Sequence, residues 1–270
     1  MKTKYIKKVL LCRPTYYRVD YEINPWMKKG LVDRDKALHQ WETLVQTLEA
    51  LNIQADTVEQ HEDYPDMVFA TDEGVVYQKN ILLSNFRYRQ RQGEVTHYIP
   101  WYKSEKLAIV RLKSQFSFEG GDAVWWRDRL FIGYGFRTDS NAVREIIQLF
   151  DTDVYTIHLV DPFYFHLDTC LFVLNDDVAF YYPPAFDQPS QDLLRRVIPK
   201  LEILTEEEAA AFAANSLVTD HHVIIPRQKT DFAHRVRDFG YIPVEVPVDE
   251  FLKSGGGIHC LTQIIEEEYA

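Results

Sequence analysis

Four residues whose side chains can do covalent chemistry recur along this chain at related spacings. Asp66, Glu119, His166 and Cys260 are separated by 53, 47 and 94 residues, and 94 is twice 47. A cysteine thiolate is a nucleophile, histidine transfers protons near neutral pH, and carboxylates hold or orient cations. Each residue alone has an equally good structural explanation in a turn, a polar loop or the core. If the chain consists of repeated modules, the shared spacing predicts that these side chains converge.

The cysteine of this set follows a run of glycines, Ser254-Gly255-Gly256-Gly257. Glycine lets the backbone approach a ligand closely, so the run could carry the thiol of Cys260 to a substrate. A flexible loop before a final strand, with Cys260 packed as a small apolar residue, fits the same pattern. Cys12 and Cys170 lie in apolar, strand-like runs, and we expect both to be core residues.

Short pairs of strand-like segments supply the repeat that the spacing requires. Four such pairs are expected at 67–84, 122–135, 168–183 and 215–226, with turns at 72–74, 127–128, 175–177 and 220–221. A last strand at 260–265 needs the N-terminal strand 8–12 as its neighbour. The starts of these five units are spaced by 55, 46, 47 and 45 residues.

Amphipathic stretches between the pairs predict helices, at 33–51, 140–150, 190–200 and 230–239. The chain is therefore expected to be an α/β protein of five strand, strand, helix, strand modules, about 45 to 50 residues each, a period typical of radial or stacked repeats. Alternating strands and helices also occur in proteins without repeats. Since no linker rich in Pro, Gly or Ser divides the chain, we expect residues 1–270 to form one catalytic domain.

Composition narrows the class of protein. The 270 residues carry a net charge of -11, which disfavours nucleic acid as a partner and favours a small cationic one. No apolar run is long enough to span a bilayer, and no signal-peptide pattern begins the chain, so we expect a cytoplasmic protein without a membrane partner. The three cysteines have no metal-ligand spacing, so neither a metal nor a cofactor is expected. A homo-oligomer remains open.

Seven ordered segments give the chain a resemblance to the guanidino-group modifying enzymes, the superfamily of arginine deiminases, dimethylarginine dimethylaminohydrolases and amidinotransferases. The segments are Cys12-Arg13-Pro14, Asn24-Pro25-Trp26-Met27, residues 65–72, Phe118-Glu119-Gly120-Gly121-Asp122, residues 133–138, His166-Leu167-Asp168 and residues 255–260. Residues 19–27 and Arg91-Gln92-Gly93-Glu94 look most like the compact arginine dihydrolase branch of cyanobacteria. The resemblance covers nearly the whole chain and implies a five-module α/β propeller, the pentein fold, with its active site at the centre.

The resemblance also implies roles for individual residues. Cys260 would attack the guanidinium carbon and form a covalent thiouronium intermediate, and His166 would protonate the leaving amine and then activate water. Glu119 would hydrogen-bond His166 or the substrate. The remaining residues would hold an arginine-like substrate: Asp72 and Asp168 its guanidinium, Arg91 and Arg137 its α-carboxylate, and Asn24 its amino end. Asp66 would be a further polar anchor that contacts the substrate. A solvated basic cluster explains Arg91 equally well, and an Asn-Pro turn explains Asn24.

One departure from the dihydrolase branch bears on the product. That branch carries asparagine where this chain has Asp72, and an anion there favours a cationic guanidinium over a neutral ureido group. We therefore expect one hydrolysis of arginine or an N-methylated arginine, giving citrulline and ammonia or a methylamine. Three alternatives remain: a dihydrolase that continues to ornithine, an amidinotransferase and, at lowest weight, a non-enzymatic binding protein of the same fold.

Overall fold

The structure is a computed structural model that describes residues 3–269. Within this range the strands form five three-stranded sheets, one for each predicted module. In every sheet the central strand pairs antiparallel with the strand before it in the module and parallel with the strand after it. In sheet order the strands are β15 (Gln263–Tyr269), β1 (Lys4–Arg13) and β2 (Gln54–Glu59); β3 (Gly74–Tyr77), β4 (Asn80–Leu83) and β5 (Ala108–Val110); β6 (Ala123–Trp126), β7 (Arg129–Tyr134) and β8 (Val154–His158); β9 (Leu171–Val173), β10 (Val178–Tyr181) and β11 (Lys200–Ile203); and β12 (Leu217–Thr219), β13 (His222–Pro226) and β14 (Ile242–Val246).

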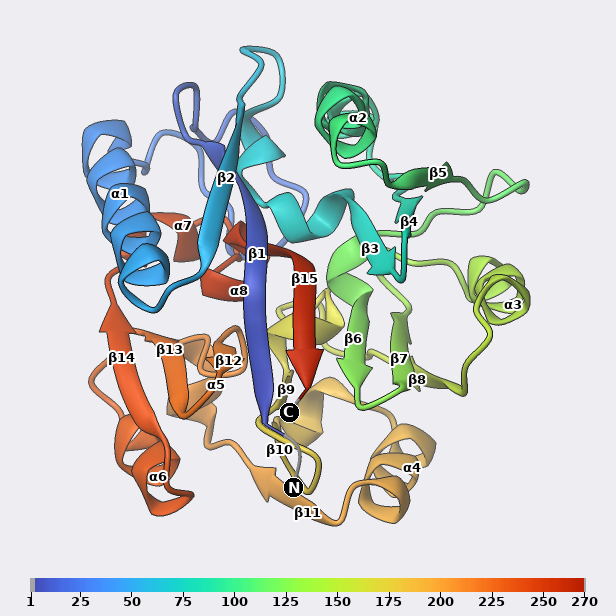
Figure 1. Cartoon of the computed structure of the whole chain (residues 1–270), viewed down its shortest axis with the longest axis vertical. Coiled ribbons are helices and arrows are strands. Elements are labelled where there is room, and N and C mark those ends of the chain that lie inside the picture. Colours follow the sequence, from blue (N-terminus) through green and yellow to red (C-terminus); the bar gives the residue numbers. More distant parts are fainter. Residues whose placement is uncertain (1–2, 270) are drawn as a thin grey trace.

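One helix joins the second and third strands of each module, and these helices lie at the periphery, around the strands (Figure 1). They are α1 (Arg34–Ala50), α2 (Glu94–Ser104), α3 (Ser140–Leu149), α4 (Gln188–Val197) and α6 (Phe232–Asp238). The shorter helices are α5 (Glu206–Ala210), α7 (Asp249–Leu252) and α8 (Ile258–Leu261), with 3₁₀ helices at Pro65–Val68, Ala70–Glu73, Gly120–Asp122, Leu167–Thr169 and Pro183–Ala185. Several starts follow from local capping: the side chains of Asp33, Asp139 and Asp187 each accept a backbone N–H from the first turn of α1, α3 and α4.

Strand β1 shows how the sequence builds the core. Its central residues are fully buried, and their side chains alternate between two sides of the strand. Val9 and Leu11 pack in the cluster that contains residues of α1, whereas Leu10 and Cys12 pack with Tyr98 of α2. The strand is thus covered by the helix of its own module and by the helix of the next. The predictions that Cys12 and Cys170 are core residues are confirmed, since neither is exposed.

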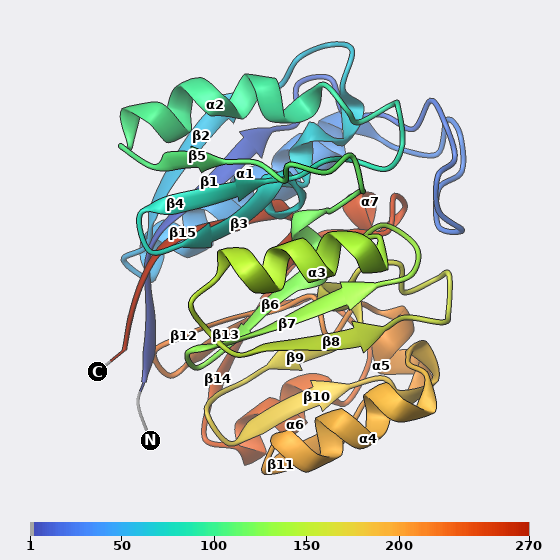
Figure 2. The same ribbon diagram turned by 90° about the vertical axis from the view of Figure 1, so that its right-hand side faces the viewer.

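The last strand completes its sheet with the first one, as predicted. In the pairing of β15 with β1, Lys4 lies opposite Tyr269 and Leu10 opposite Gln263, so the two ends of the described chain run side by side. Figure 2 shows these ends on the opposite side of the molecule from the long segment that joins β1 to α1. The chain ends and the segment between β1 and α1 therefore lie on opposite faces of the molecule (Figure 2).

Two local predictions were wrong. The first hairpin turns at Gln78 and Lys79 rather than at 72–74, because residues 70–73 form a 3₁₀ helix that leads into β3. Gln78 adopts a positive φ of 54°, a backbone conformation that is uncommon for glutamine, so the residue type did not indicate a turn here. Cys260 does not begin the last strand but lies in α8, and β15 starts at Gln263. Among residues 3–269, none of the helices combines the length and apolar character that crossing a bilayer demands.

Candidate active site

Short helical turns before the first strand of the modules position the candidate residues. Asp66 lies in the 3₁₀ helix Pro65–Val68, Glu119 and His166 directly precede the 3₁₀ helices Gly120–Asp122 and Leu167–Thr169, and Cys260 lies in α8. The 3₁₀ helices Ala70–Glu73, Gly120–Asp122 and Leu167–Thr169 contact one another in module order, and α8 contacts the first of them. Glu119, His166 and Cys260 therefore lie at corresponding places just before the first strand of their sheets. Asp66 lies one turn earlier, because the 3₁₀ helix Ala70–Glu73 separates it from β3.

Glycine residues allow the turns of neighbouring modules to pack closely against one another. A Cβ atom on Gly121 would lie 2.7 Å from both Asp72 Oδ1 and His166 Nδ1, and one on Gly256 would lie 2.4 Å from the ring of Phe69. Real side chains do not tolerate such distances. The glycines therefore let the turns of neighbouring modules meet closely enough for their functional side chains to face one another.

His166 lies between two carboxylates. Its Nε2 is 2.9 Å from Glu119 Oε2, and its Nδ1 is 3.4 Å from Asp72 Oδ1. Burial alone would lower the pKa of this imidazole, but the negative charge of Asp72 and the hydrogen bond to Glu119 outweigh burial and raise its pKa to about 9. At neutral pH the ring is thus an imidazolium, which can act as a general acid.

Glu119 is the anion that His166 and Arg137 share. Arg137 Nη1 donates to Glu119 Oε2 at 2.8 Å, and the backbone N–H of Arg87 donates to the other oxygen at 3.1 Å. Burial raises the pKa of a carboxyl group, but here the charge of Arg137 and the contact with His166 hold the pKa of Glu119 well below its ordinary value. The carboxylate is therefore ionised at neutral pH.

The thiol of Cys260 is buried and has two polar neighbours. Asn215 Nδ2 donates to its Sγ at 3.0 Å, and the thiol donates to Asp168 Oδ2 at 3.3 Å. Burial, together with the negative charges of Asp168 and Asp72, raises the pKa of Cys260 well above its ordinary value. The resting group is therefore a thiol, and a bound cation is needed to stabilise the thiolate.

Asn215 is a residue that the sequence analysis missed. It lies at the corresponding place of the remaining module, after Ala213 and Ala214, and the sequence analysis assigned it no role in the site. Besides its bond to the thiol, the side-chain oxygen accepts the backbone N–H groups of Gly257 and Cys260 at 3.0 and 3.1 Å. This explains why Cys260 lies in a helical turn instead of a strand. The module spacing already pointed to this position, but an amide side chain carries no catalytic signature.

Arg91 is fully enclosed by acidic side chains, so its interpretation as a solvated loop residue is wrong. Only 2% of its surface is exposed. Its Nη1 is 2.6 Å from Asp72 Oδ2, and its Nη2 is 2.8 Å from Glu94 Oε2. In this state the guanidinium of the chain itself occupies one oxygen of Asp72, which the sequence analysis expected to bind the guanidinium of a substrate.

Asp66 and Asn24 border the same space. Asp66 accepts a hydrogen bond from Tyr21 at 2.9 Å through Oδ2, its Oδ1 has no partner among the described residues, and burial raises its pKa. Asn24 donates to the carbonyl of Ser254 at 3.0 Å, and its oxygen accepts two backbone N–H groups of the turn that follows. Most of the hydrogen bonds of Asn24 therefore stabilise the turn, in agreement with the alternative interpretation of Asn24 as part of an Asn-Pro turn.

Seven of the nine predicted site residues line one small pocket, all except Glu119 and Asp168. Glu119 lies behind His166, and Asp168 lies behind the thiol and borders a second, larger cavity. The small pocket has a volume of about 10 Å³, which is roughly the room that a single water molecule needs. A substrate of the size of arginine can enter only if residues that line the pocket move. Within residues 3–269, no group of three or more His, Cys, Asp or Glu could hold a metal ion.

The charge on His166 makes stability depend on pH. Its pKa of about 9 lies above the ordinary 6.5, so its contribution is fully present below about pH 6.5 and is lost as the pH rises through about 9. Between these limits, we expect the free energy of unfolding to fall by about 3 kcal/mol more in the wild type than in His166→Asn. Urea unfolding of both proteins at several pH values measures this difference. Parallel pH profiles of the two proteins would contradict the charged imidazole.

A buried thiol beside an imidazolium and several carboxylates, on five small α/β modules, defines the guanidino-group modifying enzymes, and the comparisons with known proteins confirm this class. The family model "N,N dimethylarginine dimethylhydrolase, eukaryotic" matches residues 17–266. A dimethylarginine dimethylaminohydrolase of Mycobacterium tuberculosis is 34% identical over 263 residues, which are 97% of this chain and 86% of that protein. The chain belongs to this family of hydrolases, which act on the carbon–nitrogen bonds of amidines.

Two cyanobacterial proteins are about as similar to this chain, but the similarity covers only part of their own length. The bifunctional arginine dihydrolase/ornithine cyclodeaminase ArgZ of Synechocystis is 35% identical over 267 residues, 96% of this chain but 38% of that protein. This chain thus spans about two fifths of the length of the bifunctional relatives. The solved N-terminal domain of ArgZ, covalently bound to a reaction intermediate, superposes with a TM-score of 0.92 at 35% identity and covers 96% of this chain and 98% of that domain.

Proposed function

We propose that this chain is a cysteine-dependent hydrolase of the guanidinium group of arginine or an N-methylated arginine. It would give citrulline and ammonia or a methylamine. One observation carries the proposal: the thiol of Cys260 and the imidazolium of His166 line the same buried pocket as Asp66 and Asp72. A nucleophile, an acid and anions for a planar cation are what attack on a guanidinium requires.

We also infer that the five modules form the α/β propeller of the pentein fold and that residues 1–270 are a single catalytic domain. Five sheets of one topology support this architecture, as do the contacts between successive helical turns at the candidate site. Such an arrangement brings one turn from each module to the centre. The candidate residues come from different modules for that reason.

The first chemical step uses the cation to create its own nucleophile. A guanidinium held by Asp72 and Asp168 beside the thiol lowers the pKa of Cys260, and the thiol releases its proton to solvent. The thiolate forms a bond to the guanidinium carbon, and the carbon–nitrogen bond then breaks with its electron pair on the amine. His166 gives its proton to that amine and becomes neutral, which leaves a thiouronium on Cys260.

The second step returns the enzyme to its starting state. Neutral His166 takes a proton from a water molecule whose oxygen bonds to the thiouronium carbon. The carbon–sulfur bond breaks with its electron pair on the sulfur, and the product oxygen loses the second proton of the water, which gives the ureido product. The released thiolate of Cys260 takes up a proton and becomes a thiol again. Glu119 supports both steps because it holds the ring and stabilises its charged form, as the third member of a triad does.

The remaining residues would hold the substrate in place. Asp72 and Asp168 would contact the guanidinium, while Arg91, Arg137 and Asn24 would hold the α-carboxylate and amino end. Arg91 must exchange its contact with Asp72 for the substrate carboxylate, whereas its bonds to Glu94 can stay. Substrate binding would thereby free Asp72 at the moment when a new cation needs it.

A second round of hydrolysis, which gives ornithine, is the main competing function. The names of the cyanobacterial relatives, arginine dihydrolases, favour it. The carboxylate of Asp72 argues against it, because an anion binds a neutral ureido group more weakly than a guanidinium. An amidinotransferase would use the same residues but pass the amidino group to an amine.

Product analysis separates these functions. We expect purified protein incubated with arginine, monomethylarginine or dimethylarginine to yield citrulline and the matching amine, identified by mass spectrometry. Ornithine formed without accumulation of citrulline would contradict the single round. A new guanidino compound after addition of glycine, ornithine or lysine would show transfer, and the absence of any conversion would remove the hydrolase proposal.

A further inference from the structure

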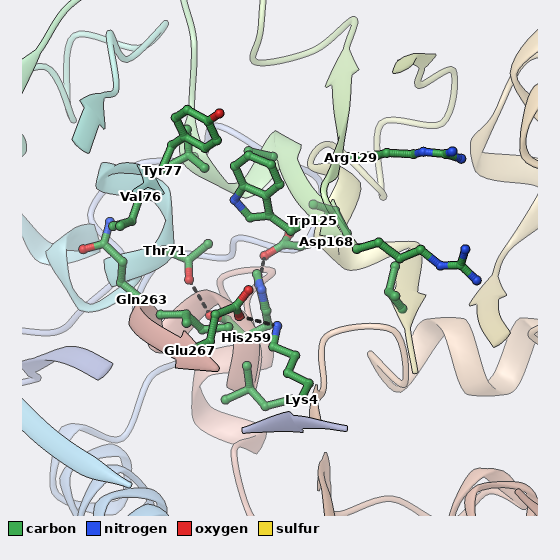
Figure 3. Close-up of a pocket in the computed structure, with 18 of the residues that line it drawn as sticks. Lys4, Thr71, Val76, Tyr77, Trp125, Arg129, Asp168, His259, Gln263 and Glu267 are labelled. Atoms are coloured by element: carbon green, nitrogen blue, oxygen red, sulfur yellow. Dashed lines mark hydrogen bonds and ion pairs between the residues drawn. The ribbon is translucent and has the colours of Figure 1, made fainter. Parts of the chain in front are cut away.

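A second cavity, much larger than the small pocket, borders Asp168, the carboxylate that accepts a hydrogen bond from the candidate nucleophile. Its volume is about 740 Å³, and we call it the large cavity. Lys4, Thr71, Gln263 and Glu267 are among its lining residues, and Asp168 and His259 also border it. Figure 3 shows the imidazole of His259 directed at the carboxylate of Asp168 among the side chains of this cavity. The proposed chemistry gives His259 no task.

His259 connects this cavity to the thiol through one carboxylate oxygen. His259 Nδ1 is 2.9 Å from Asp168 Oδ2, and the same oxygen accepts the thiol of Cys260 at 3.3 Å. The other oxygen of Asp168 is buried and has no partner among the described residues. Asp168 is 2% exposed, whereas the side chain of His259 keeps 21% of its surface exposed. The imidazole and the thiol are therefore the two hydrogen-bond donors to this carboxylate within residues 3–269.

The contact has a direct consequence for the nucleophile. A carboxylate next to a thiol holds the thiol proton and opposes the thiolate. An N–H that donates to the same oxygen takes up part of its negative charge and fixes its position. Without His259, the charge of Asp168 would fall on the thiol alone, and the thiolate would form less readily.

We propose that His259 is a positioning residue that acts through Asp168 to keep Cys260 reactive, from the side of the large cavity. This inference rests on the proposed function, since it concerns the nucleophile of that reaction. The backbone of His259 is held independently of its ring: its carbonyl accepts from Thr71 at 2.7 Å, and its N–H donates to the carbonyl of Asn215 at 3.2 Å. A change of the side chain therefore leaves the turn in place.

The large cavity permits a chemical-rescue experiment. His259→Ala removes the ring and leaves a space for free imidazole to enter from solution. We expect kcat and the rate of Cys260 alkylation by iodoacetamide each to fall about 10- to 100-fold, the effect of one hydrogen bond to a charged group. KM should change little, because His259 does not line the small pocket. Added imidazole should restore both rates in part, and His259→Asn, which keeps a donor, should lose less.

Two controls make the outcome decisive. His221→Ala, a histidine whose side chain is 69% exposed, should show neither the loss nor a response to imidazole. Wild-type rates in His259→Ala would overturn the proposal. So would a loss that His259→Asn shares in full and that imidazole does not restore, since that pattern means a purely structural role. If the wild type turns over no guanidino compound, the proposed function fails, while the alkylation rates still test the contact.

Discussion

Replacement of Cys260 by serine is expected to abolish turnover while the protein stays folded. A serine hydroxyl does not ionise near neutral pH, so no bound cation can convert it into a comparable nucleophile. Loss of a covalent nucleophile lowers kcat by about 10⁴-fold or more. Because serine can still accept from Asn215 and donate to Asp168, we expect the free energy of unfolding to change by no more than about 1 kcal/mol. Steady-state kinetics and urea unfolding measure the two effects.

Cys12→Ser is the matched control for this change. Cys12 is fully buried in β1, so a hydroxyl there should lower the free energy of unfolding by about 1–3 kcal/mol while kcat is preserved. The two substitutions should thus show opposite patterns. Comparable turnover by Cys260→Ser and the wild type would eliminate the covalent mechanism.

Replacement of Glu119 by glutamine is expected to have the second-largest effect, on activity and stability together. The change leaves Arg137 buried without its closest anion, and His166 loses one of the two carboxylates that stabilise its charge. Loss of a buried counter-charge costs about 3–5 kcal/mol, and the comparable change in a catalytic triad lowers kcat by about 10⁴-fold. The pKa of His166 should fall, which moves the alkaline limit of activity to lower pH.

Asp122→Asn provides the comparison for Glu119→Gln. Asp122 is equally buried, but burial raises its pKa to about 7, and its Oδ1 accepts the N–H of Leu167, a bond that an asparagine oxygen can keep. Because the charge of Asp122 also helps to raise the pKa of His166, we expect a smaller loss of stability and a smaller shift of the alkaline limit than in Glu119→Gln. If both variants shift the pH profile equally, Glu119 has no special role beside His166.

Much of the architecture could be predicted because it depends on local patterns. Hairpins with polar turns, such as Arg127-Asp128, and helices with an aspartate at the start, such as α1 and α3, carry their signals in a few adjacent residues. The spacings of 47 and 94 residues between Glu119, His166 and Cys260, one and two module lengths, then predicted that they lie in equivalent turns. The sequence pattern thus predicted the modules and the convergence of the site.

The contacts that tune the site could not be predicted, because they join residues that lie far apart in the sequence. Asn215 contacts Cys260 across 45 residues, and His259 contacts Asp168 across 91. Arg91 appeared to belong to a basic surface cluster, and only the fold shows that Asp72 and Glu94 enclose it. Burial and pairing of this kind depend on the assembled modules.

The central claim is that hydrolysis proceeds through a covalent bond to Cys260. Its most direct test is peptide mapping by mass spectrometry of protein quenched during turnover of isotope-labelled arginine, in the wild type and in His166→Asn, where the second step should be slow. We expect the peptide that contains Cys260 to carry the mass of arginine less ammonia. Label on another residue, or product formation by protein whose Cys260 has been fully alkylated, would contradict the claim.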